Sequence, residues 1–259
     1  MRRLTVVEPV SRAAIWSKRL AVLALVVAGL SVLLARRHAA EPGAALTVFG
    51  AALIVAGLAL VLAGAAASII WREGLRGAGQ AFLGFALSAG LIAYPAYLAA
   101  LAFALPKIDD VSTDLASPPS FLISPRARAA GVLAEPPNPS AAERSAQKDA
   151  YPDLQTIKVE MDALDAYRLA LSVATDLGWR IVDLRPPSPS GAGSGTIEAI
   201  DRSLFFAFPS DIVIRVTPGS TSTAIDLRAV SRVEKHDFGA NAARIRTFAA
   251  AIADAPLER

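Results

Sequence analysis

The sequence has no cysteine and only two histidines among its 259 residues. The absence of cysteine excludes disulfides, thiolate zinc sites, iron–sulfur clusters and thiol catalysis. His38 sits beside two arginines, whereas His236 is flanked by Glu234 and Asp237. One histidine with two carboxylates in a loop is a weak metal signal. We therefore predict a solvated loop at His236, with no metal and no cofactor.

Charged residues are absent from the interior of three apolar stretches, which run over Leu20–Ala35, about Ala44–Ile70 and about Ala78–Leu105. A bilayer core of about 30 Å is crossed by roughly 20 apolar residues in a helix. The second and third stretches are long enough, whereas the first is short and needs its flanking arginines to snorkel. We predict a three-helix transmembrane region over residues 1–105. The lack of internal charges argues against a transporter, pump or channel.

The first apolar stretch has an alternative interpretation as a signal peptide, with a basic start and Ala35 or Ala40 at the cleavage point. Arginines directly after an apolar run are unusual in a cleavage region, so we favour the transmembrane helix. Both interpretations leave the C-terminal half on the same side of the membrane.

Basic residues are unequally distributed between the two sides of the predicted helices. The N-terminal side carries Arg72 and Arg76 in the second loop. Ahead of the first helix it also carries Arg2, Arg3, Arg12, Lys18 and Arg19. The opposite side has Arg36 and Arg37, and after the third helix only Lys107 against three nearby aspartates. The positive-inside rule then predicts a cytoplasmic N-terminus in a bacterial inner membrane and a periplasmic C-terminal domain.

Gly50, Gly57 and Gly64 recur at every seventh position of the second stretch. Small residues along one stripe let helix backbones approach closely. We favour packing between the second and third helices of one chain, with homo-oligomerisation as the alternative.

Prolines and small polar residues dominate the segment 106–150, which contains Pro118-Pro119 and Pro136-Pro137. No apolar period of helix or strand persists there. We predict a Pro-rich linker with extended or loosely ordered backbone. The apolar island Phe121-Leu122-Ile123 is a candidate for docking on the following domain.

Residues 151–259 have the patterning of a soluble α+β domain. We expect strands at 156–160, 179–184, 196–201, 210–217 and 223–230, helices at 162–178 and after Asp237, and a short strand or extended pairing at 204–208. This order predicts an antiparallel sheet with two helices packed on one face. Asn241 lies on the apolar stripe of the last helix and requires a buried hydrogen-bonding partner.

The last two strands alternate apolar and polar residues, so their pairing register can be predicted. The apolar faces coincide only if odd positions of one strand oppose even positions of the other. A turn at Gly219-Ser220 places Asp211 opposite Arg228 and Val213 opposite Asp226. We therefore predict a charged, solvated sheet face held by cross-strand ion pairs.

Several motifs are similar to those of the family known as domain of unknown function 1499. They are Asp109–Asp114 with Pro118-Pro119, Ala150–Leu154, Ile197–Ala199, Asp211–Val216, Ser231-Arg232 and Asp237–Ile245. The resemblance extends from about Lys107 to Ile252, and the last motif is the most specific. Glu234 departs from the family, which has a small glycine there. The resemblance implies a bacterial or plastid-type domain, often membrane-attached, with no assigned activity.

A basic cluster at the start of the last helix is the candidate site. Its members are Arg228, Ser231, Arg232, Asp237, Gly239, Asn241 and Arg244. Free backbone N–H groups and guanidinium forks favour phosphate or carboxylate ligands. The alternative is a structural network in which Asp237 neutralises a nearby arginine.

No catalytic residues are predicted, because Gly191–Gly195 matches neither a nucleophile elbow nor a phosphate-binding loop. The net charge of +3 is small and gives no support to nucleic-acid binding. We predict a non-enzymatic, membrane-anchored periplasmic module that binds an anionic ligand, a lipid headgroup or an envelope protein. A hydrolase-like envelope enzyme using Arg228, Arg232 and Asp237, or a purely structural envelope protein, are the alternatives.

Overall fold

The structure is a computed structural model that describes residues 9–37, 41–122, 124, 129, 135–188, 193–233 and 235–255. Arg2, Arg3, His38, Ile123 and Glu234, which enter the predictions above, lie outside these ranges. The chain divides into two compact units. One contains the described residues up to Ala100 together with Phe205–Ala207, and the other contains Leu101–Leu204 and the residues from Phe208 onwards.

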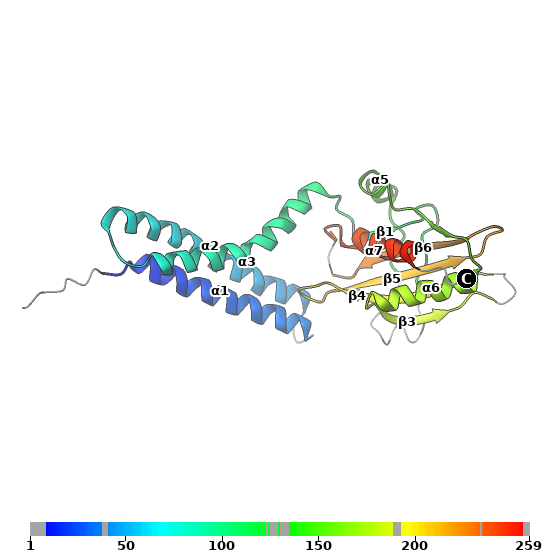
Figure 1. Cartoon of the computed structure of the whole chain (residues 1–259), viewed down its shortest axis with the longest axis horizontal. Coiled ribbons are helices and arrows are strands. Elements are labelled where there is room, and N and C mark those ends of the chain that lie inside the picture. Colours follow the sequence, from blue (N-terminus) through cyan, green and yellow to red (C-terminus); the bar gives the residue numbers. More distant parts are fainter. Residues whose placement is uncertain are drawn as a thin grey trace, which may run out of the picture. The chain divides into compact units, whose positions relative to one another are not determined.

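Three long helices make up most of the first unit: α1 over Arg12–Arg36, α2 over Pro42–Glu73 and α3 over Ala78–Ala104 (Figure 1). All three are long and apolar enough to cross a membrane, which confirms the predicted helices. The first helix has 25 residues and is longer than predicted, because it continues through the polar residues before Leu20. At 1.5 Å per residue it is about 37 Å long, which is enough for a bilayer core.

Alanines and serines, rather than glycines, form the contact between α1 and α2. The buried side chains are Ala14, Ser17, Ala21, Ala24, Ala28, Ser31 and Ala35 on α1, and Ala45, Ala52, Ala56, Ala59, Ala63 and Ala66 on α2. The Ser17 hydroxyl donates to the Ala59 carbonyl at 3.0 Å. A Cβ added at Gly50, Gly57 or Gly64 would meet nothing within 4 Å, so this glycine stripe does not pack α2 against α3. On α3, by contrast, a Cβ at Gly84 would collide with Ser17.

The second unit is built on one antiparallel sheet, as predicted. Its strands are β1 (Asp110–Ser112), β2 (Ile157–Val159), β3 (Arg180–Arg185), β4 (Gly195–Arg202), β5 (Pro209–Thr217) and β6 (Thr223–Ser231). The strand order is β1-β6-β5-β4-β3, and β2 also pairs with β6. The expected strand at 204–208 is absent, because residues 203–208 form the turn between β4 and β5.

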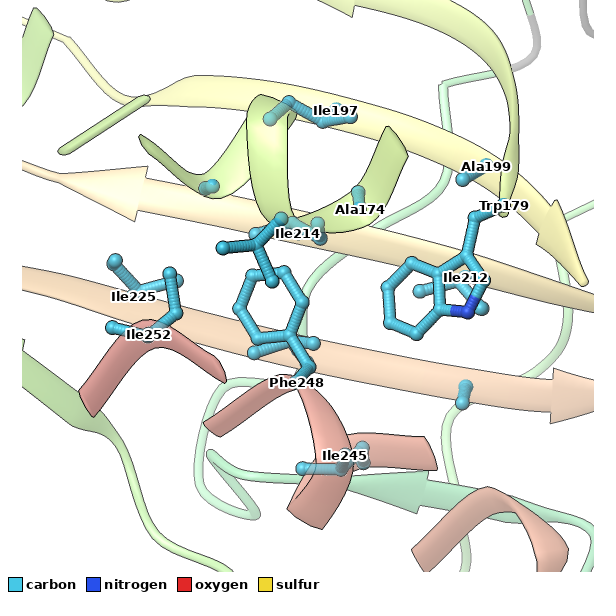
Figure 2. Close-up of a cluster of buried hydrophobic side chains, with 14 of the residues drawn as sticks. Ala174, Trp179, Ile197, Ala199, Ile212, Ile214, Ile225, Ile245, Phe248 and Ile252 are labelled. Carbon is cyan, nitrogen blue, oxygen red and sulfur yellow. The ribbon is translucent and has the colours of Figure 1, made fainter. Parts of the chain in front are cut away.

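Helices α6 (Ala163–Asp176) and α7 (Ala240–Asp254) pack on one face of this sheet and enclose the core. Asp162 caps α6 by accepting from the backbone N–H groups of Leu164 and Asp165. Figure 2 shows the ring of Trp179 beside that of Phe248, stacked with centroids 5.6 Å apart. Isoleucines from β4, β5 and β6 complete the core.

The register of β5 and β6 confirms the predicted parity but differs from the predicted pairs by two residues. Val213 lies opposite Arg228, and Arg215 lies opposite Asp226. Asp211 pairs with Val230 rather than with Arg228. The reason is that the turn is centred one residue further along the chain than Gly219-Ser220. Each residue of β5 therefore pairs with the β6 residue two positions beyond the predicted one, and the apolar faces still coincide.

The segment 106–150 differs from the expected loose linker, because its described residues form part of the folded unit. It contributes β1 to the sheet and the helix α5 (Ala141–Ala150), which Ser140 and Glu143 cap reciprocally. The Gln147 side chain accepts from the backbone N–H of Ser112 and donates to its carbonyl, at 3.1 and 2.7 Å. Phe121 is buried against Val213 and Val230, on the sheet face opposite to α6 and α7.

Candidate functional site

The second sheet face carries charged side chains from three neighbouring strands, namely Glu198 of β4, Asp211 and Arg215 of β5, and Asp226 and Arg228 of β6. We call this set the polar face. Residues Thr113–Leu122, here called the strap, cover much of it. The prediction of a solvated face is therefore wrong, because Glu198, Asp211, Asp226 and Arg228 are all buried.

Arg228 lies at the centre of the polar face and has no exposed surface. Its Nε donates to both carboxylate oxygens of Asp110 at 3.1 Å, and Nη2 lies 2.7 Å from Asp110 Oδ2. The same guanidinium donates to the carbonyls of Pro119 and Pro137, and it lies over the Phe121 ring at 5.6 Å. Burial raises the pKa of Asp110, against the opposing effect of Arg228. This arginine is thus fully engaged inside the protein.

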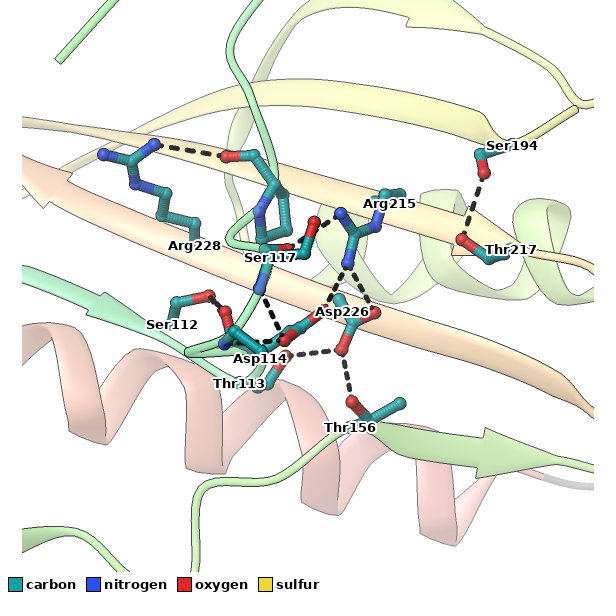
Figure 3. A network of polar contacts seen from close by, with 12 residues as sticks. Ser112, Thr113, Asp114, Ser117, Thr156, Ser194, Arg215, Thr217, Asp226 and Arg228 are labelled. Atoms are coloured by element: carbon teal, nitrogen blue, oxygen red, sulfur yellow. Dashed lines mark hydrogen bonds and ion pairs between the residues drawn. The ribbon is translucent and has the colours of Figure 1, made fainter. Parts of the chain in front are cut away.

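A second network joins Arg215 to two aspartates (Figure 3). Its Nη2 lies 3.0 Å from Asp226 Oδ2 and 2.9 Å from Asp114 Oδ2. Asp226 Oδ1 accepts hydrogen bonds from the hydroxyls of Thr113 and Thr156 at 3.1 and 2.6 Å. Nη1 of Arg215 donates to the Ser117 carbonyl at 2.9 Å, so this network also holds the strap on the sheet.

The other two predicted arginines are each paired with an aspartate. Arg232 forms a bidentate pair with Asp211, through Nε–Oδ2 at 2.7 Å and Nη2–Oδ1 at 2.5 Å. Arg244 Nε lies 2.5 Å from Asp201 Oδ2, and its Nη1 donates to Asn241 Oδ1 at 2.8 Å. Bidentate arginine–carboxylate pairs are strong and directional, so a ligand anion would have to compete with these aspartates.

The start of α7 is occupied by protein groups. Asp237 accepts from the backbone N–H groups of Gly239 and Asn241 at 3.0 and 2.7 Å, and burial raises its pKa. The N-cap position itself belongs to Gly239, with φ of 80°. The Asn241 amide donates to the Asp109 carbonyl and to the Ser231 hydroxyl at 2.8 and 3.1 Å, which provides the partner that we predicted for it.

The structure therefore brings Ser231, Asp237, Gly239, Asn241 and Arg244 into one connected set of hydrogen bonds. Arg228 and Arg232 belong to other pairs, with Asp110 and Asp211 respectively.

Glu198 is a buried acid that our choice of site residues missed. One carboxylate oxygen accepts the Leu122 backbone N–H, and the other is buried without a hydrogen-bond partner among the described residues. Burial, reinforced by the charges of Asp183 and Asp211, raises the pKa of Glu198 to about 7. Its position between Ile197 and Ala199 in an alternating strand places it on the polar face. The apolar island at Phe121-Leu122 predicts docking on the domain, but the sequence does not indicate that Glu198 lies beneath it.

The described residues contain no group of three His, Asp or Glu side chains that could hold a metal ion. His236 Nδ1 accepts from the Phe238 backbone N–H at 3.1 Å, and the two rings stack with centroids 4.6 Å apart. An open hollow of about 540 Å³ lies elsewhere, lined by Glu160–Ala163 and Pro218–Thr223. It includes none of the predicted site residues.

A family model described as protein of unknown function (DUF1499) matches residues 110–252, from the start of β1 to the last turns of α7. The match confirms the resemblance stated above and covers more than half of the chain. Searches of curated proteins and of solved structures each return no match.

Proposed function

The chain belongs to the DUF1499 family of proteins of unknown function, and we propose that it is a non-catalytic, membrane-anchored interaction module. In this proposal the three apolar helices hold the family domain at a bacterial inner membrane, and the domain lies in the periplasm. The partner is an envelope component rather than a substrate that the protein transforms.

The pairing of the buried charges is the observation that carries this proposal. Arg228, Arg232 and Arg244 each contact an aspartate at 2.7 Å or less. Catalytic acids and bases have to reach a substrate with a free proton-transferring atom. Asp237 instead accepts from two backbone amides of α7, and this favours the interaction module over the hydrolase alternative.

The proposed orientation has support from the distribution of basic residues. Lys18 and Arg19 of α1 belong to the same predicted side as Arg72 and Arg76, and the short loop after Arg36 belongs to the opposite side. With three crossings, an N-terminus in the cytoplasm places the family domain outside.

Single cysteines provide the test of orientation, since the natural chain has none. Ser220→Cys lies in the exposed turn between β5 and β6, and Glu73→Cys lies at the exposed end of α2. In intact cells with a permeabilised outer membrane, an impermeant maleimide should label Ser220→Cys and leave Glu73→Cys unlabelled until the inner membrane is opened. The opposite pattern would contradict the periplasmic assignment.

A second candidate function is anion capture at Arg232. Its side chain is 22% exposed, compared with 12% for Arg244 and none for Arg228. A phosphate or carboxylate could therefore approach Arg232 without movement of the strap, provided that it displaces Asp211.

The paired variant Arg232→Gln/Asp211→Asn removes both charges and avoids leaving either one buried alone. If Arg232 captures anions, glycerol 3-phosphate should raise the melting temperature of the natural chain and not that of the variant. Equal shifts in the two proteins, or no shift in either, would count against capture at Arg232 and would leave the interaction module in place.

A further inference from the structure

The turn between β4 and β5 presents three consecutive large apolar residues, Leu204, Phe205 and Phe206. We call them the apex. Leu204 is 79% exposed and Phe205 is 41% exposed. The turn is closed on both sides, because the Ser203 backbone N–H donates to the Phe208 carbonyl and the Phe208 N–H donates to the Ser203 hydroxyl, each at 2.9 Å. Exposed apolar groups held in this way usually mark an interaction surface.

The register of the sheet puts the apex at the end of the family domain where the chain arrives from α3. Ser210, at the start of β5, pairs with Asp201 of β4 and with Ser231 of β6. The Ser231 backbone N–H donates to the carbonyl of Asp109, the residue before β1, at 2.9 Å. The β4–β5 turn and the start of β1 therefore lie at the same end of the sheet.

The covalent connection keeps this end of the family domain close to the end of α3. Helix α3 ends at Ala104 and β1 begins at Asp110, so the intervening backbone spans at most about 20 Å. The β4–β5 turn leaves the same end of the sheet, so its three apolar residues are within reach of the bilayer that α3 crosses in our proposal.

We propose that the apex inserts into the lipid interface of the leaflet that faces the family domain, and provides a second membrane attachment beside α3. The partner is the lipid bilayer itself. Leu204 inserts its large exposed surface among the acyl chains, and the rings of Phe205 and Phe206 lie at the level of the headgroups. This inference is independent of any ligand of the domain.

The test uses the full chain in liposomes with a single labelled cysteine. Leu204→Cys carries the environment-sensitive fluorophore NBD, and the matched control is Ser220→Cys at the opposite end of β5, where the turn is exposed. We expect phosphatidylcholine with a doxyl group near the headgroup to quench the apex label at least several-fold more than the control label. Iodide in the buffer should quench the two labels in the reverse order.

Two results would overturn the proposal. One is iodide quenching of the apex label equal to that of the control, which would place the apex in water. The other is a blue-shifted apex label that doxyl lipid fails to quench, which would mean that it packs only on protein. With Trp16 and Trp71 replaced by Phe in both labelled proteins, the emission of Trp179, buried in the core, verifies that each protein is folded.

Discussion

Replacing Glu198 by Gln should remove a dependence of stability on pH that the natural chain carries. Glutamine keeps the size of the side chain and an oxygen that can accept the Leu122 N–H. It removes the proton that the buried carboxyl binds. Any difference between the two proteins across the neutral range then reports on this one group.

The magnitude follows from the change in the pKa of Glu198 on folding. That pKa is about 7 in the folded protein, against an ordinary value of 4.5. Since the folded state binds the proton more tightly, stability is greatest below the unfolded pKa and falls as the pH rises through the folded one. The free energy of unfolding should decrease by about 2–3 kcal/mol between about pH 5 and about pH 8 through this group alone.

Trp179 serves as the reporter, because it is buried in the core and is the one tryptophan of the second unit. With Trp16 and Trp71 replaced by Phe, its fluorescence follows urea unfolding of the family domain in detergent or nanodiscs. The stability of Glu198→Gln relative to the parent should rise with pH by the amount given above. Glu160→Gln, at an exposed glutamate, controls for the loss of a negative charge. Parallel pH profiles for Glu198→Gln and the parent would refute the assignment of a buried proton to Glu198.

Two further predictions concern buried packing. Arg228→Met should destabilise the domain by about 3–5 kcal/mol in the urea titration described above, because it leaves the Asp110 carboxylate buried without its partner. The control Arg168→Met breaks an exposed pair and should cost less than about 1 kcal/mol. Gly84→Ala should lower the melting temperature of the helical unit in detergent, because its Cβ collides with α1, whereas Gly57→Ala should be tolerated. Equal effects within either pair of variants would contradict the packing described here.

The sequence by itself determined the elements whose signals are local. Apolar length identifies the three membrane helices, since the bilayer sets the number of residues required. Alternation identifies β4, β5 and β6 and the parity of their pairing, because a slip by one residue would expose Ile212 and Leu227. The need of Asn241 for a partner also follows from its place on an apolar stripe.

Only the tertiary structure decided how the segment 106–150 folds and which residues cover the polar face. The strap has no period of its own, and it is held by residues about a hundred positions away, such as Arg215 on Ser117 and Arg228 on Pro119. The ion pairs Arg215–Asp226 and Arg232–Asp211 depend on the register of β5 and β6, and a displacement of the turn by one residue changes every pair in that register. Partners of this kind are set by the closure of the whole sheet, and no local pattern encodes them.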